Sequence, residues 1–433
     1  MSHDYQYGKY LKLGTLICAH IIVTCISLIY VSYDMAPTAF NPATYHVFFR
    51  LSGLPAAILA VAGFSLVAPL FVVARFSFGY LVGLNFFTMI LGYLWLNCFT
   101  DLAYDHRAAG LSAAASALAF LIPAFLITTP TRPPYTVSEQ ALDRILLATI
   151  VFAAAVVAAG ATYNFRMVSL REIYMFRDKL GLPTILNYLI GITSSSLLPF
   201  VFAVSTARKN FWAAGAALLL LLLVYPISLS KFALFAPLFL LGLFVLTKLF
   251  DTRIAAILSL LGPTILGMAL ITLFPENAER FFALINFRMM AIPSIAMDVY
   301  NDFFSRHELT HFCQITSLKH IFACPYQEPL AVMLERVYDL GNFNASLFAT
   351  EGIASVGLTF APASALICGL GVALVNHLSA GLPARFILLS GALMTQVMLN
   401  VPLSTTLVTH GAALLFLLWA VTPRSIFEQN SGR

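Results

Sequence analysis

The chain has 433 residues, of which 60% are hydrophobic and only 10% are charged, and its formal net charge is +5. Soluble domains are roughly half apolar and bury that half in a core, so a mean hydropathy of +0.88 is too high for one of this length. The composition therefore excludes a soluble globular enzyme and predicts an integral membrane protein. We expect membrane lipids around the chain and no nucleic acid as a partner.

Apolar runs long enough to cross the ~30 Å hydrocarbon core recur along the whole sequence. Because a membrane-spanning segment must satisfy its own backbone hydrogen bonds, these runs predict an all-α fold. We expect about twelve transmembrane helices, which make residues 1–433 a single polytopic membrane domain. The expected spans lie near 13–33, 53–74, 77–99, 110–129, 145–162, 184–206, 211–228, 232–249, 254–274, 352–378, 385–402 and 405–422.

The distribution of Lys and Arg sets the expected orientation. An even number of spans places both termini on one side, and cations of the short loops favour that side, so we expect both termini in the cytoplasm. Residues 275–350 then form one large loop on the external face. Near its end, EPLAVMLERVYDLG predicts an amphipathic helix at about 328–340 that lies on the membrane or caps a cavity.

Several external cations oppose the positive-inside tendency. They are Arg166, Arg171 and Arg177 in YNFRMVSLREIYMFRDKLGLP, Lys231 after a short SLSK turn, and Arg280 and Arg288 in the long loop. Guanidinium forks match phosphate oxygens, so this pattern predicts an anionic ligand on the external face. The alternative is that these cations pair with neighbouring carboxylates or meet lipid headgroups.

The long loop contains two further motifs. Cys313 and Cys324 are expected to form a disulfide on an oxidising face, the alternative being two buried thiols. HELTH, from His307 to His311, matches the H-E-x-x-H pattern of zinc peptidases. No strong helical pattern frames it and no motif for a third ligand follows, so we expect polar loop residues and no metal. A membrane zinc peptidase remains an alternative.

The stretch NFNASLFATEGIASVG, residues 342–357, puts a carboxylate at the threshold of an apolar span. A charge at that position is costly unless it has a partner or a task. Partial desolvation would raise the pKa of Glu351 toward that of a general base. The alternative for Glu351 is a salt bridge to an arginine, and Asp298 and His311 are rival bases.

Four stretches, in order, resemble the Wzy-type oligosaccharide repeat-unit polymerases, the O-antigen and exopolysaccharide polymerase family. They are SLREIYMFRDKLG (169–181), ISLSKFALFAPLFLLGL (227–243), FRMMAIPSIAMDVYNDFF (287–304) and the stretch 342–357. The resemblance covers about 165–360. The Cys313–Cys324 pair and HELTH depart from the family's pattern.

The resemblance implies a GT-C-like fold and a metal-independent, inverting glycosyltransferase without a cofactor. It would act at the periplasmic face of the bacterial inner membrane. Its donor would be a growing glycan on undecaprenyl pyrophosphate, and its acceptor a single repeat unit on a second such lipid. A polysaccharide chain-length regulator is an expected partner. A glycan ligase of the same fold is the nearest alternative, and a lipid or polysaccharide transporter is a further one.

The resemblance also assigns roles to residues. Arg177 and Arg288 would stabilise the departing pyrophosphate, and Glu351 would take the proton of the acceptor hydroxyl. The remaining roles are pyrophosphate binding by Arg166, Arg171, Arg280 and Lys231, and sugar binding by Asn342, Asn344, Tyr174 and Tyr300.

Overall fold

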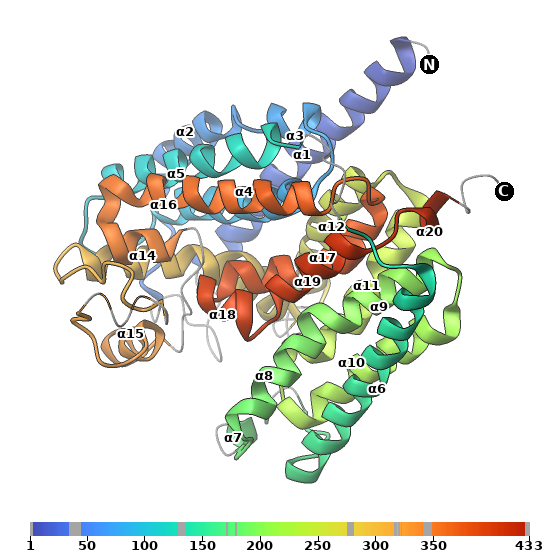
Figure 1. The fold of residues 1–433 in the computed structure, drawn as a ribbon. Helices are drawn as coiled ribbons and strands as arrows, with labels where there is room; N and C mark the ends of the chain where they lie inside the picture. Colours follow the sequence, from blue (N-terminus) through green and yellow to red (C-terminus); the bar gives the residue numbers. More distant parts are fainter. Residues whose placement is uncertain are drawn as a thin grey trace. The chain divides into compact units, whose positions relative to one another are not determined.

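The structure of the protein is a computed structural model (Figure 1). It describes residues 3–33, 45–128, 135–169, 172–177, 180–274, 281–315, 318, 321, 323–340 and 349–428. Within these ranges the regular structure is helical, apart from one isolated antiparallel bridge between Val47 and Thr100. The prediction of an all-α fold is confirmed for this part of the chain.

Ten helical stretches of the described chain are long and apolar enough to cross a membrane. They are Gly8–Ser32, Leu51–Val73, Phe78–Leu96, His106–Leu126, Glu139–Tyr163, Thr184–Ala207, Phe211–Ser228, Lys231–Leu249, Thr252–Leu273 and Thr350–Leu378. The last two expected spans coincide with the shorter apolar helices α17 (Ala384–Asn400) and α19 (Ala412–Val421). The chain is therefore a polytopic membrane protein.

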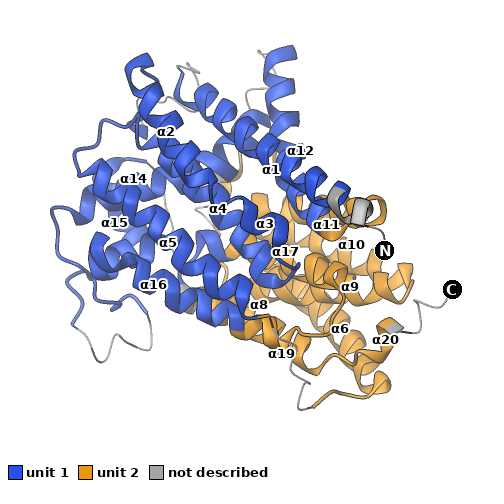
Figure 2. Cartoon of the chain, turned by 90° about the horizontal axis from the view of Figure 1, so that it is seen from above, with its two compact units in different colours: residues 1–127, 253–373, 398–402 blue, residues 128–252, 374–397, 403–433 orange. Residues whose placement is uncertain are grey.

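The chain divides into two compact units (Figure 2). Unit 1 comprises residues 1–127, 253–373 and 398–402, and unit 2 comprises residues 128–252, 374–397 and 403–433. Two helices, α16 (Thr350–Leu378) and α17, contribute residues to both units.

Unit 1 is built around α4 (Phe78–Leu96), in which every residue is buried. A side chain at Gly92 would bring its Cβ within 2.5 Å of the Ser294 hydroxyl, so this glycine lets α14 approach α4 closely. The other helices of the unit are α1 (His3–Ser32), η2 (Leu51–Gly53), α2 (Leu54–Ser65), α3 (Pro69–Val73), α5 (His106–Leu126), α12 (Thr252–Leu273), η4 (Ala283–Ala291), α14 (Ile292–Phe304), α15 (Leu330–Tyr338) and most of α16.

Residues 281–304 form a helix inside the segment that the sequence assigned to the long external loop. Its first part is the π-helical segment η4, and α14 follows without a break. Polar residues interrupt its hydropathy, but they are paired: Asn286 donates to the Ser27 hydroxyl and to the Thr264 carbonyl, each at 2.9 Å. These bonds let a partly polar helix pack against α1 and α4. Later in the same segment, α15 lies where an amphipathic helix was expected.

Unit 2 is organised by α10 (Phe211–Ser228), which packs against α6 (Glu139–Tyr163), α9 (Leu198–Ala207) and α11 (Lys231–Leu249). A left-handed residue, Leu229 at φ 48°, ends α10 and turns the chain into α11. The remaining helices of the unit are α7 (Ile173–Arg177), α8 (Thr184–Ile192), η3 (Thr193–Leu197), most of α17, α18 (Leu403–Val408), α19 and α20 (Ser425–Glu428).

Candidate functional site

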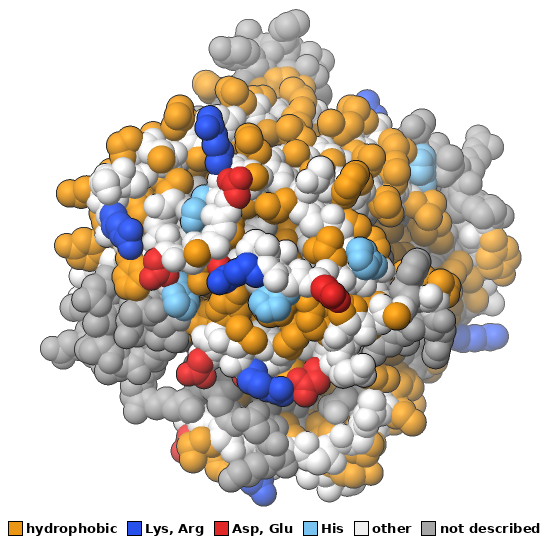
Figure 3. All heavy atoms as spheres, turned by 90° about the vertical axis from the view of Figure 1, so that its left-hand side faces the viewer, with side chains coloured by type: hydrophobic (Ala, Val, Ile, Leu, Met, Phe, Trp, Pro, Cys, Tyr) orange, Lys and Arg blue, Asp and Glu red, His pale blue; other side chains and the backbone are white. Residues whose placement is uncertain are grey.

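Polar residues of unit 1 gather where α4 and α14 end and where α5 and α16 begin. Asn97, just after α4, donates its side-chain amide to the His106 carbonyl at 2.9 Å. Tyr104, just before α5, lies 2.5 Å from an oxygen of Asp298 on α14. Figure 3 shows charged and histidine side chains gathered among hydrophobic ones on the face toward which α14 and α15 lie in Figure 1. Three carboxylates of this region, Asp298, Asp302 and Glu351, are buried.

Asp298, a rival base in the sequence, is 1% exposed. Its Oδ1 contacts the Tyr104 hydroxyl, whereas its Oδ2 has no hydrogen-bond partner among the described residues. Burial raises the pKa of Asp298, and the hydrogen bond with Tyr104 opposes that rise only in part. Burying a carboxyl oxygen without a hydrogen-bond partner is costly, so this arrangement requires either a role in function or a carboxyl that is protonated.

Asp302, one helical turn later, is fully engaged. Its Oδ1 accepts the Ala103 backbone N–H at 3.0 Å, and its Oδ2 accepts the Tyr338 hydroxyl at 2.5 Å. Arg306, in the turn just after α14, forms an ion pair with it. The hydrogen bond and the charge of Asp302 raise the pKa of Arg306. Asp302 therefore ties α14 to α15 and to the loop before α5, and its role is structural.

Glu351 is the second residue of α16 and is 8% exposed. Its neighbour Tyr300, on α14, is fully buried. Burial and the negative charge of Glu351 both raise the pKa of the Tyr300 hydroxyl. The Tyr300 ring therefore packs inside unit 1 and presents no open face for stacking on a sugar.

The HELTH segment docks on a break in α16. Gly357 has φ 73° and ψ 175°, which interrupts the helix. The backbone N–H of Thr310 donates to the Ala354 carbonyl at 2.8 Å, and that of His311 donates to the Ser355 carbonyl at 3.1 Å. The loop thereby satisfies carbonyls that the break would otherwise leave unpaired.

HELTH itself is not helical. The ring of His307 stacks on Phe303, with centroids 3.9 Å apart, and its Nδ1 bonds the Phe303 carbonyl at 2.8 Å. His311 is exposed and left-handed, at φ 48°. The one-turn spacing that a zinc peptidase needs is thus not produced by a helix here. Within the described ranges no group of three or more His, Cys, Asp or Glu is arranged to hold a metal.

The loop that follows HELTH contains a disulfide. Cys313 is bonded to Cys324, and their Cα atoms are 5.3 Å apart. Cys313 is fully buried, and the Tyr326 hydroxyl donates to the Glu308 carbonyl at 2.6 Å. The Tyr326 ring also lies against Phe303 and Phe304, so this hydrogen bond and these ring contacts hold Tyr326 at the end of α14.

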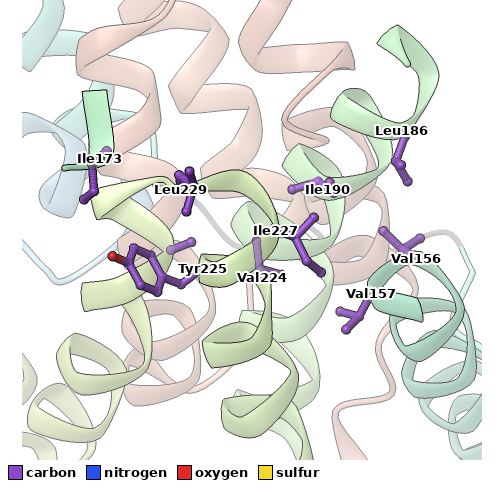
Figure 4. Close-up of a cluster of buried hydrophobic side chains, with 10 residues drawn as sticks. Val156, Val157, Ile173, Leu186, Ile190, Val224, Tyr225, Ile227 and Leu229 are labelled. Carbon is purple, nitrogen blue, oxygen red and sulfur yellow. The ribbon is translucent and has the colours of Figure 1, made fainter. Parts of the chain in front are cut away.

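One end of unit 2 carries the second group of candidate residues. A hydrophobic cluster there joins α6, α7, α8 and the α10–α11 turn; it contains Val156, Val157, Ile173, Leu186, Ile190, Val224, Tyr225, Ile227, Leu229 and Ala233 (Figure 4). The Arg166 backbone N–H donates to the Pro226 carbonyl at 2.9 Å, and the Tyr225 hydroxyl donates to the Val168 carbonyl at 2.6 Å. The segment after α6 is thereby fixed to the end of α10.

Three basic positions are brought to this end of unit 2. Arg166 is exposed, and its guanidinium lies over the Phe176 ring, 5.7 Å from the centroid. Arg177 is the last residue of α7, whose Ile173 is anchored in the cluster. Lys231 is the first residue of α11, two positions after the clustered Leu229. We call these positions the basic end of unit 2.

The other predicted residues lie in several places. Arg288 is on η4 in unit 1, and its side chain is exposed. The side chains of Tyr174 and Arg177 and the whole of Arg171, Arg280, Asn342 and Asn344 are outside the described residues. The sequence reading missed Asn97, Tyr104 and Asp302. The polar run NCFTDLAYDHR (97–107) between two spans was the available signal for the first two.

No protein-family model, no curated protein and no solved structure matches the chain.

Proposed function

We propose that the protein is a membrane glycosyltransferase that polymerises undecaprenyl-pyrophosphate-linked oligosaccharide repeat units at the periplasmic face of the bacterial inner membrane. The observation that carries this proposal is the convergence of Arg166, Arg177 and Lys231 at the basic end of unit 2, although they come from three separate elements. External cations that oppose the insertion rule and that the fold gathers together suit a polyanionic ligand.

The chemistry of the proposed reaction requires such cations. As the bond between the anomeric carbon and the pyrophosphate oxygen breaks, the leaving group takes the electron pair and gains negative charge. A cation next to that oxygen stabilises the transition state more than the ground state. Arg177, at the basic end of unit 2, is assigned this role, and Arg166, Arg171 and Lys231 bind the rest of the pyrophosphate. Side chains that supply this charge make a metal-independent mechanism feasible.

Inversion requires a base that takes the proton from the attacking acceptor hydroxyl. Glu351 is assigned this role because it is a buried carboxylate in the first turn of a membrane helix. In the proposed step the acceptor oxygen bonds to the anomeric carbon, its proton passes to Glu351, and undecaprenyl pyrophosphate departs. Asn342, Asn344 and Tyr174 hold the sugars, and a chain-length regulator sets the final polymer length.

The test is a transfer assay with purified protein in detergent, where no membrane gradient exists. The substrates are undecaprenyl-pyrophosphate-linked repeat units, and the products are followed by mass spectrometry. Lipid-linked glycans of two or more repeats, with one undecaprenyl pyrophosphate released per bond, are expected. If the glycan moves only to an added non-lipid acceptor, the protein is a ligase. If no glycosidic bond forms, as expected of a transporter, the proposal is wrong.

A further inference from the structure

The hydrogen bonds around Tyr104 determine the protonation state of Asp298. Tyr104 has one hydroxyl hydrogen and two short oxygen contacts: Asp298 Oδ1 at 2.5 Å and Asn97 Oδ1 at 2.8 Å. A third neighbour, the Tyr93 hydroxyl at 3.3 Å, accepts from the Asn301 amide and is free to donate its own hydrogen to Tyr104. A hydroxyl donates one hydrogen bond only, so one of these two short contacts must have its hydrogen on the other atom.

The orientation of the Asn97 amide is fixed. Its nitrogen donates to the His106 backbone carbonyl at 2.9 Å, and a carbonyl oxygen only accepts. The other atom of the amide, Oδ1, is therefore an acceptor, and it lies 2.8 Å from both the Tyr104 hydroxyl and the His106 Nδ1. The first contact requires the Tyr104 hydrogen, and the second requires a hydrogen on His106 Nδ1.

With the Tyr104 hydrogen assigned to Asn97, the contact with Asp298 has a hydrogen only if Asp298 carries it. An ionised Asp298 would instead take the Tyr104 hydrogen and leave two oxygen lone pairs facing each other at the Asn97 contact. A neutral Asp298 satisfies both contacts, because its hydroxyl donates to Tyr104 and Tyr104 donates to Asn97. It also explains Oδ2, since an unpaired carbonyl oxygen is less costly to bury than an unpaired charge.

The surroundings of Asp298 agree with a neutral acid. The titratable groups that face it are Tyr93 on α4, Cys98 just after α4, and Tyr104, with His106 of α5 reached through Asn97. Among the described residues no Lys, Arg or His forms an ion pair with Asp298. Arg306, the cation that follows α14, forms an ion pair with Asp302.

We propose that Asp298 is a neutral carboxylic acid at neutral pH and that it donates its proton to the Tyr104 hydroxyl, whose orientation it thereby fixes. Tyr104 and His106 are partly exposed while Asp298 is buried, so the stored proton is one hydroxyl away from solvent. Asp298 is thus a positioning residue that acts through Tyr104. One consequence rests on the proposed function: a neutral Asp298 already holds a proton and cannot accept one from the acceptor hydroxyl. The general base of the proposed transfer is therefore Glu351.

Isotope-edited infrared spectroscopy of the purified protein, labelled at the aspartate carboxyl carbon, tests the protonation state without any activity assay. A protonated-carboxyl band at neutral pH is expected in the wild type and absent in Asp298→Asn. In Tyr104→Phe the band should move to a higher frequency, because the carboxyl hydroxyl loses its acceptor. Asp105→Asn, which changes an exposed neighbour that caps α5, should leave the band unchanged.

A second variant tests the cause. Asn97→Leu removes the oxygen that accepts the Tyr104 hydrogen, so Tyr104 can then donate to an ionised Asp298. The protonated-carboxyl band should therefore disappear at a lower pH than in the wild type. The proposal is overturned if the wild type shows only ionised aspartate at neutral pH, or if Tyr104→Phe leaves the band in place. If the bands behave as expected but no glycan is extended in the transfer assay, the proposed function fails and the protonation state stands.

Discussion

The backbone N–H of Thr310 lies 2.8 Å from the carbonyl oxygen of Ala354, which joins the loop after α14 to the point where α16 breaks. In an unbroken helix the Ala354 carbonyl would accept the N–H of Leu358. The non-helical backbone at Gly357 interrupts this pattern, and the Thr310 N–H of the loop donates to the Ala354 carbonyl. The Ser112 hydroxyl completes the arrangement by donating to the Leu358 carbonyl at 2.6 Å. The break is therefore a built feature, supported by α5 and by the HELTH loop.

Replacing Gly357 by alanine should destabilise the protein. Its backbone conformation is essentially restricted to glycine, and forcing another residue into it costs roughly 1–3 kcal/mol. Gly371→Ala is the matched control on the same helix, because an added Cβ there meets nothing within 4 Å. Thermal unfolding in detergent checks this. Equal melting temperatures for the two variants would show that alanine adopts the Gly357 backbone conformation without a cost in stability, which would contradict the prediction.

Cys313→Ser should lower stability more than activity. Opening a disulfide of this loop size typically costs about 2–4 kcal/mol, largely because the unfolded chain regains freedom. Cys18→Ser, at an exposed free cysteine of the same unit, is the control. Melting under non-reducing conditions is the measurement, together with the rate of glycan transfer per folded molecule. A wild-type melting temperature for Cys313→Ser would contradict the role of the disulfide.

Stability should depend on pH through Asp298. Burial raises the pKa of Asp298, so above the ordinary carboxyl pKa the unfolded chain has released a proton that the folded protein still holds. Stability should therefore fall as pH rises from that ordinary range to the raised pKa. Asp298→Asn removes this group, so the melting temperature of the variant should decline less over the same pH interval. Parallel curves for wild type and variant would contradict a raised pKa.

Removing the charge of Lys231 should slow chain extension. If the basic end of unit 2 binds the departing pyrophosphate, Lys231→Ala loses one transition-state contact, which is worth roughly 10²-fold or more in rate. Lys248→Ala, at the opposite end of the same helix, is the control and should transfer at the wild-type rate. The measurement is the rate of glycan transfer in detergent, normalised to folded protein. If both variants transfer at the wild-type rate, pyrophosphate does not bind at Lys231.

Hydropathy predicted most of the fold, because each membrane helix satisfies its own backbone and needs no partner to be recognised. The helix over 281–304 was not predicted, because its polar residues depend on partners in other segments. Asn286, Asp298 and Asp302 interrupt its apolar pattern, and they are acceptable inside unit 1 only because of partners distant in the sequence. The division of the chain into two units also depends on packing between distant segments, which no local pattern reports.

The candidate site shows the same limit. The sequence singled out Glu351 as the candidate base and Asp298 as a rival base, and both are buried in unit 1. It did not predict that Tyr104 would bond to both Asn97 and Asp298, because Tyr104 and Asp298 are almost two hundred positions apart. Tyr300 was expected to bind sugar from its place in the segment assigned to the external loop, but it lies on α14 and is fully buried.

The central claim is that this protein joins lipid-linked repeat units. The most direct test is the surface-polysaccharide length profile, by gel, of a strain that lacks the gene and is complemented with wild type or with Glu351→Gln. The account predicts that the wild type restores a ladder of polymer lengths, whereas the empty strain and the Glu351→Gln strain keep single repeats attached to their anchor. An unchanged ladder in the empty strain would contradict the proposed polymerase, and a full ladder with Glu351→Gln would remove Glu351 as the base.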